Sequence, residues 1–172
     1  MRGWLVACVT AEMVALGCWV GGLTVLVAAA IPAVFNTFGG QDAGGLFLTR
    51  VFEGYNRLVL GAIVILVGGA LWRQVAPGRQ WPWLKPTRIE WAVLAGMVVI
   101  AGVIIFGLHP VAATRQAEAF AIKETGARKA ALEAFFKIHQ PTRVLYLLNL
   151  VLGVVLLGAK VRPWVTRSEA TT

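Results

Sequence analysis

Four long apolar stretches separated by polar segments dominate the sequence, at about residues 4–35, 52–72, 91–108 and 143–159. About 20 apolar residues are enough for a helix to cross the hydrocarbon core of a bilayer. Each stretch therefore predicts a membrane-spanning helix, and the first is longer than the core is thick. An even number of spans predicts that both ends of the chain lie on one side of the membrane.

The polar segment before the last stretch also has a helical pattern, because Ala, Glu, Lys, Arg and Gln recur from about residue 111 to 138. Four residues near its end follow the i, i+3, i+4, i+7 spacing of one helix face, namely Leu132, Phe135, Phe136 and His139. We expect one amphipathic extramembrane helix that leads into the last span, with a kink at Pro141.

The composition agrees with a membrane protein, since 58% of the residues are hydrophobic and only 14% are charged. Soluble domains average about 25% charged residues, so there is too little polar surface here to cover a water-soluble globule. The sequence predicts an all-α fold in the lipid bilayer, an antiparallel four-helix bundle with an amphipathic helical extension before the last span. We expect a single membrane domain, residues 1–172.

The net charge of +8 does not indicate nucleic acid binding, because basic residues beside membrane spans follow the positive-inside rule. The segment from Arg73 to Glu90 carries four basic residues and no acid before Glu90. The basic residues on the other side lie mostly in the long, acid-balanced polar segment, where the rule is weaker. We expect both termini in the cytoplasm of a bacterial cell, with the bundle in the inner membrane.

Short motifs along the chain occur in the order typical of one family. The first half has Trp19-Val20-Gly21-Gly22, Pro32, Phe35, Ala43-Gly44, Phe52 and Tyr55; the second half has Pro110, Arg115, Phe135-Phe136-Lys137-Ile138-His139 and Thr142. Together they resemble the transmembrane protein 205-like family over about residues 19–150. The resemblance implies a bundle of about four membrane helices of undefined function. Where that family tends to have an asparagine, this chain has Tyr146, and the nearest amide is Asn149.

A candidate ligand- or partner-binding cluster, the outer cluster, lies around the outer end of the second span and comprises Arg50, Glu53, Tyr55, Arg57, His139 and Arg143. Arg50, Glu53 and Arg57 recur at i, i+3, i+7 and share one helix face. Ionisable residues at membrane depth usually face partners or water. The cluster is either an anion or headgroup site, or an ion triad that fixes the helix at the interface, with Arg57 paired to Glu53.

Glu12 lies inside the first span, about 12 Å along the helix from Trp4. In the last two spans no basic residue is clearly at its depth, whereas Asn149 is a candidate partner. Glu12 is therefore either the coupling group of a transporter or a protonated acid that hydrogen-bonds to a neighbouring helix.

His109 and His139 flank the polar segment near the outer boundary. Two imidazoles suffice as axial ligands of haem b, and with Glu53 they would supply a His/His/carboxylate metal set. The alternative is that His139 is a helix-junction residue held by Phe135 and Phe136, with one internal hydrogen bond. We expect no cofactor, and haem b is the alternative.

Gly17 and Gly21 form a Gly-x-x-x-Gly face, with Gly22 beside it. Small residues let another helix approach closely, so this face predicts packing inside the bundle or, alternatively, a seam with a second copy or another membrane subunit. Nucleotide-binding, metalloprotease and catalytic carboxylate motifs are absent from the sequence. We expect a non-enzymatic binding or accessory module, with a haem or metal redox protein and a transporter as the alternatives.

Overall fold

The computed structural model describes residues 2–38, 41–75 and 84–169, and these ranges form helices with only short connections. In chain order the helices are α1 (Arg2–Val25), α2 (Ile31–Phe38), α3 (Gln41–Val75), α4 (Arg88–Gly102), α5 (His109–Ala121) and α6 (Thr125–Glu169). Two π-helical segments, η1 (Leu26–Ala30) and η3 (Val103–Leu108), join α1 to α2 and α4 to α5 without a break. The predicted all-α fold is confirmed.

Four continuous helical segments of the described chain are long and apolar enough to cross a membrane: Gly3–Phe38, Asp42–Val75, Arg88–Ala121 and Thr125–Pro163. Large apolar side chains point outward along them, and Val64 and Phe106 are each 72% exposed. Such a surface is favourable only against lipid tails, because soluble monomers rarely expose contiguous apolar patches of this extent. The chain is an integral membrane protein.

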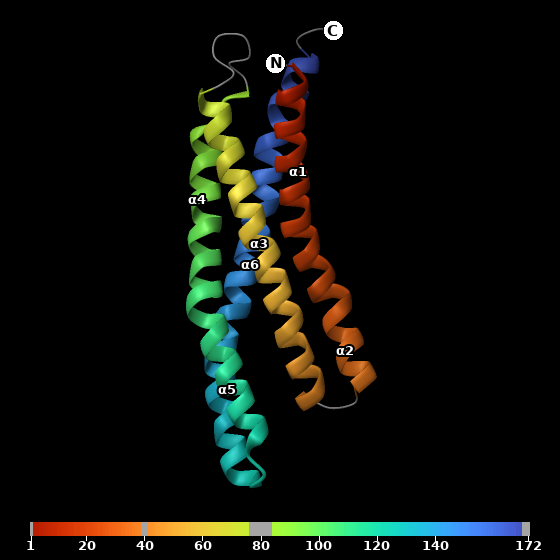
Figure 1. The fold of residues 1–172 in the computed structure, drawn as a ribbon, viewed down its shortest axis with the longest axis vertical. Coiled ribbons are helices and arrows are strands. Elements are labelled where there is room, and N and C mark those ends of the chain that lie inside the picture. Colours follow the sequence, from red (N-terminus) through yellow and green to blue (C-terminus); the bar gives the residue numbers. More distant parts are fainter. Residues whose placement is uncertain (1, 39–40, 76–83, 170–172) are drawn as a thin grey trace.

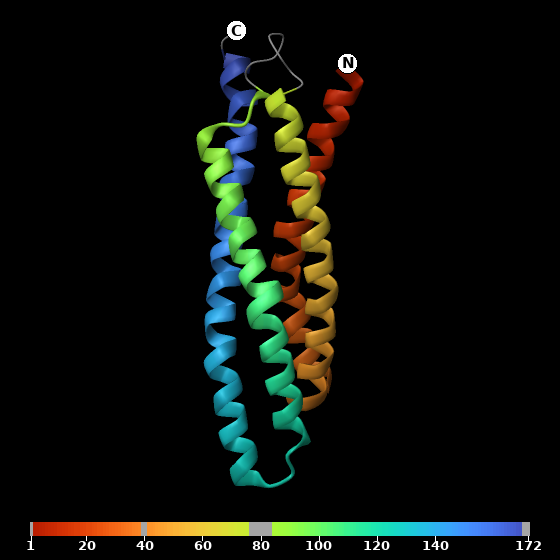
Figure 2. The same ribbon diagram turned by 60° about the vertical axis from the view of Figure 1, so that its left-hand side comes forward.

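The bundle consists of two antiparallel hairpins. In the first hairpin α1 and α2 pack along α3, and in the second α4 and α5 pack along α6 (Figure 1). Both ends of the chain lie at one end of the bundle, together with the end of α3 and the start of α4; we call this the terminal end. At the opposite, distal end, α5 and α6 extend beyond α2 and α3 (Figure 2).

The prediction of one extramembrane helix over 111–138 is wrong. α5 continues the third membrane-crossing segment to Ala121. The backbone at Ile122 is extended (φ −78°, ψ 123°), and α6 starts at Thr125. The chain reverses there because α5 has a buried face, Ala112, Gln116 and Ala119, which needs a neighbour. The returning α6 packs beside α5.

The helices accommodate their internal prolines in two ways. Pro32 and Pro110 each follow a π-helical segment closely, and a wider turn relieves the clash between a proline ring and the carbonyl one turn earlier. Pro141 lies inside α6, which is helical on both sides of it. The expected kink at Pro141 stays a prediction.

Candidate functional site

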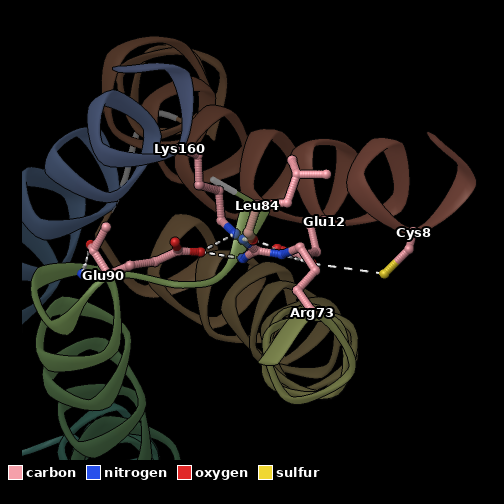
Figure 3. A network of polar contacts seen from close by, with 7 residues as sticks. Cys8, Glu12, Arg73, Leu84, Glu90 and Lys160 are labelled. Atoms are coloured by element: carbon pink, nitrogen blue, oxygen red, sulfur yellow. Dashed lines mark hydrogen bonds and ion pairs between the residues drawn. The ribbon is translucent and has the colours of Figure 1, made fainter. Parts of the chain in front are cut away.

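Four buried ionisable side chains, one from each membrane-crossing segment, meet near the terminal end (Figure 3). This group, the charge ring, consists of Glu12 on α1, Arg73 on α3, Glu90 on α4 and Lys160 on α6. Glu12 is 1% exposed, and the side chain of Lys160 is 7% exposed. Charged side chains are almost never buried to this degree unless they are paired, so their partners define the site.

Each acid of the charge ring contacts both bases. Arg73 donates from Nε to Glu12 Oε1 at 2.8 Å and from Nη2 to Glu12 Oε2 at 2.9 Å, a bidentate pair. The same Nη2 also contacts Glu90. Lys160 Nζ lies 2.7 Å from Glu90 Oε1 and also contacts Glu12. The remaining guanidinium nitrogen, Nη1, donates to the Leu84 carbonyl at 2.9 Å.

The ring pairs run both within and between the hairpins. Glu12 and Arg73 belong to the first hairpin, while Glu90 and Lys160 belong to the second. The contacts Arg73 to Glu90 and Lys160 to Glu12 cross from one hairpin to the other. Each hairpin therefore contributes one acid and one base to the charge ring, so its own two ring charges cancel. The two ion pairs between the hairpins join these two neutral halves of the ring.

Local sequence features position two of the ring residues. At Gly69, one turn before Arg73, a Cβ would lie 2.6 Å from Glu12 Cγ and 2.7 Å from its Cδ, so only glycine leaves room for this carboxylate. Glu90 is the third residue of α4, and its backbone N–H donates to the hydroxyl of the N-cap Thr87 at 3.1 Å. The cap fixes the first turn of α4 and directs Glu90 toward the bases.

A cavity of about 270 Å³ lies beside the ring. The four ring residues line it together with Lys85 and Thr87, and Val9, Met13, Ala159 and Val161 supply apolar wall. The lining carries three basic and two acidic side chains. It combines a net positive charge with an apolar surface.

The prediction that Asn149 is the partner of Glu12 is wrong. Asn149 Nδ2 lies 3.4 Å from the Met97 carbonyl, while Glu12 is paired with Arg73 and Lys160. Sequence reasoning missed the bases because both stand at the ends of their apolar stretches, where basic residues are common beside any membrane span. Long basic side chains reach several ångströms along a helix, so a base at the end of a span is able to meet an acid inside the bundle. The available signal for such a cluster was Glu90, an acid at the start of the third span.

The side chains of the outer cluster have separate environments. Arg50 pairs with Glu53 at 3.0 Å and is 80% exposed, and Arg57 is also exposed. Within the described residues Arg57 forms no ion pair, so the expected Glu53–Arg57 pair is wrong. Tyr55 points into the bundle, where its hydroxyl donates to the Trp19 carbonyl at 2.8 Å. A ligand role for the outer cluster, including the exposed Arg143, stays a prediction.

The two histidines have different surroundings. The ring of His139 stacks on Phe135 with centroids 5.1 Å apart, which confirms the predicted contact with Phe135. The predicted internal hydrogen bond of His139 is wrong within the described residues, where its imidazole has no hydrogen-bond partner. His109 begins α5, and its Nε2 is buried without a hydrogen-bond partner in the described protein. No three metal-ligating side chains gather anywhere in the described ranges, so the His109–His139–Glu53 metal set is not formed.

The glycine face of α1 only partly packs inside the bundle. A Cβ at Gly22 would lie 3.2 Å from the Tyr55 ring, whereas Cβ atoms at Gly17 and Gly21 would meet nothing within 4 Å. Gly22 therefore lies close to α3 inside the bundle, while helix packing through Gly17 and Gly21 stays a prediction. Those two glycines face away from the bundle.

Fold and site together define a four-helix integral membrane protein with a buried ionic site at one end. The chain belongs to the family described as Domain of unknown function (DUF4149), which matches residues 14–121. This range covers Arg73 and Glu90 of the charge ring. The match agrees with the expected membrane family of undefined function, while the name transmembrane protein 205-like stays a prediction. No curated protein and no solved structure matches the chain.

Proposed function

We propose that this protein is a non-enzymatic membrane binding protein that holds a phosphate-bearing ligand in the cavity beside the charge ring. The observation that carries the proposal is the lining of that cavity, where Arg73, Lys85 and Lys160 outnumber Glu12 and Glu90. Basic groups in a partly desolvated pocket bind phosphate oxygens strongly. The acids hold Arg73 and Lys160 in place and keep their charge balanced when the ligand is absent.

The apolar wall of the cavity favours a lipid headgroup as the source of the phosphate. Val9, Met13 and Ala159 are among the apolar residues that line the cavity, and they would contact the glycerol and upper acyl carbons of a phospholipid. Lys85 is exposed and Thr87 offers a hydroxyl, so these two residues would meet the phosphate first.

The sidedness of the bundle supports an anionic lipid. We infer that the terminal end lies in the cytoplasm of a bacterial cell, because Lys85, Arg88 and Arg162 add positive charge there beyond the neutral ring. Juxtamembrane basic residues are attracted to an anionic leaflet by about 1 kcal/mol each.

Partner packing through α1 is a second part of the proposal. Gly17 and Gly21 face away from the bundle with open space beside them. A helix of another membrane subunit, or of a second copy, is able to approach closely at such a face. This packing would make the protein an accessory subunit while it holds its ligand at the terminal end.

Thermal unfolding of the purified protein in neutral detergent tests ligand binding. We expect phosphatidylglycerol to raise the Tm and phosphatidylcholine to leave it unchanged, since a ligand at one hundred times its Kd stabilises by about 2.7 kcal/mol. Inorganic phosphate distinguishes the two sources of a phosphate group. If inorganic phosphate alone raises the Tm, the ligand is a free anion; if it does not, the ligand is a lipid headgroup.

Matched lysine variants locate the binding. Lys85→Gln should weaken phosphatidylglycerol binding about fivefold, which corresponds to about 1 kcal/mol. Lys129→Gln, which alters an exposed lysine at the distal end, should have no effect. Equal stabilisation by both lipids, or equal losses in both variants, would contradict the proposal.

A further inference from the structure

A second group of polar side chains, two of them buried, lies between the hairpins, away from the charge ring. Tyr146 on α6 donates its hydroxyl to Asn56 Oδ1 on α3 at 3.0 Å, which joins the two hairpins near the middle of α3. Asn149 follows one turn after Tyr146 on the same face of α6. Asn56 is 5% exposed and Asn149 is 3% exposed. We call these three residues the amide group.

Both amides have an atom with no protein partner. In the described part of the chain three buried side-chain nitrogen or oxygen atoms lack a hydrogen bond: Asn56 Nδ2, Asn149 Oδ1 and His109 Nε2. Two of the three belong to the amide group. An unsatisfied polar atom in an apolar interior costs several kcal/mol, and lipid offers no hydrogen bond to compensate for it.

Helix periodicity directs both amides toward the interface between the hairpins. On α6, Tyr146, Asn149, Gly153, Leu156 and Lys160 recur at intervals of three or four residues, and Lys160 contacts Glu12 of the first hairpin. A Cβ at Gly153 would lie 3.4 Å from Met97 and would also meet Val20 of α1. This face of α6 therefore lies between α1 of the first hairpin and α4 of the second, and Asn149 Nδ2 donates to the Met97 carbonyl of α4 at 3.4 Å.

The chemistry of the unpaired atoms identifies what would satisfy them. Asn56 Nδ2 is a donor and Asn149 Oδ1 is an acceptor, and the Tyr146 hydroxyl lies between their helices. No charged side chain belongs to the group, and Phe52 and Tyr55 pack against Tyr146 with ring centroids 5.4 and 6.4 Å away. An uncharged molecule that both donates and accepts hydrogen bonds fits these partners.

We propose that Asn56, Tyr146 and Asn149 form an internal binding site for a small uncharged hydrogen-bonding molecule, and that water occupies it in the resting protein. Buried waters in proteins make about three hydrogen bonds to groups that are otherwise unsatisfied. The site goes beyond the proposed ligand cavity and does not depend on it. It makes the middle of this membrane protein polar and hydrated.

Cysteine reactivity tests the site, because only the thiolate reacts and a thiolate forms poorly without water. Asn149→Cys is compared with Val151→Cys, whose native side chain lies on the same helix and is 58% exposed on the lipid-facing surface. Cys8 and Cys18 are first replaced by alanine. We expect iodoacetamide to modify Asn149→Cys at least about ten times faster than Val151→Cys; equal or slower modification overturns the proposal.

Hydrogen–deuterium exchange of the tyrosine hydroxyls gives a second measurement, in which Asn56 and Asn149 both stay unchanged. The chain has two tyrosines, Tyr55 and Tyr146, so Tyr55→Phe isolates the Tyr146 hydroxyl and Tyr146→Phe isolates that of Tyr55. Infrared spectra in D2O should report exchange of the Tyr146 hydroxyl at least about ten times faster than exchange of Tyr55. Equal rates would overturn the proposal even if the cysteine variants fail to fold.

Discussion

The guanidinium of Arg73 and the carboxylate of Glu12 form a bidentate pair, with donor–acceptor distances of 2.8 and 2.9 Å, although 61 positions separate the residues in the sequence. Both side chains are buried, at 7% and 2% exposure. Removing one member of a buried pair leaves an uncompensated charge, and this is far more costly than removing both. The four-residue ring extends this dependence to Glu90 and Lys160.

Glu12→Gln should destabilise the protein by about 3–5 kcal/mol, because Arg73 and Lys160 would then share a single carboxylate. Adding Lys160→Gln restores neutrality and should recover part of the loss. Unfolding in detergent followed by circular dichroism measures both effects. Glu118→Gln is the control, since Glu118 is an exposed distal acid. Strictly additive losses in the double variant would show that Glu12 and Lys160 do not interact.

Gly69→Ala should destabilise the bundle by about 1–3 kcal/mol, because the new methyl group would overlap the Glu12 side chain. The neighbouring Gly68→Ala is a matched control, since a Cβ there meets nothing within 4 Å. Alanine also has a higher helix propensity than glycine, so Gly68→Ala should be as stable as the parent or more stable. Similar Tm values for the two variants would mean that Glu12 has room to move away.

Cysteines introduced at the two ends of the bundle should report opposite sides of the membrane. Lys85→Cys lies at the terminal end and Lys129→Cys lies on α6 near the distal end, and both native side chains are exposed. A membrane-impermeant thiol reagent added to intact cells should label Lys129→Cys only. Labelling of Lys85→Cys from outside would reverse the proposed orientation.

The purified protein should have no Soret absorption band, because we expect no haem between the two histidines. His139→Gln and His139→Leu should each be less stable by about 0.5–1.5 kcal/mol, because both lose the stacking of the imidazole on Phe135, which is its contact within the described residues. A Soret band that disappears in both His109→Ala and His139→Gln would favour the redox alternative.

Apolar periodicity predicted the spans, the even number of crossings and the common end for both termini, because lipid imposes long apolar helices on any spanning chain. The reversal at Ile122 was missed since residues 122–124 contain neither glycine nor proline, the usual signals for a break in a helix. Helix-forming residues continue on both sides of residues 122–124, so the sequence pattern alone predicts one continuous helix.

The candidate site was predicted less well because its residues meet only in the assembled bundle. Glu12 was recognised as unusual from the sequence alone, since an acid inside an apolar stretch is rare. Its partners come from positions 73 and 160, and no local pattern links such distant residues. Tyr55 was likewise assigned to the outer cluster, because sequence spacing does not reveal that its hydroxyl reaches Trp19 on another helix.

The division of the ring into two neutral halves has a consequence for biogenesis. Glu90 follows Arg73 by only 17 positions, whereas Lys160 comes 148 positions after Glu12, so the whole first hairpin is synthesised before Lys160 exists. Glu12 and Arg73 already compensate each other, and this hairpin enters the bilayer without a net buried charge. The second hairpin inserts in the same way through Glu90 and Lys160. Assembly of the bundle then needs only lateral association of two inserted units.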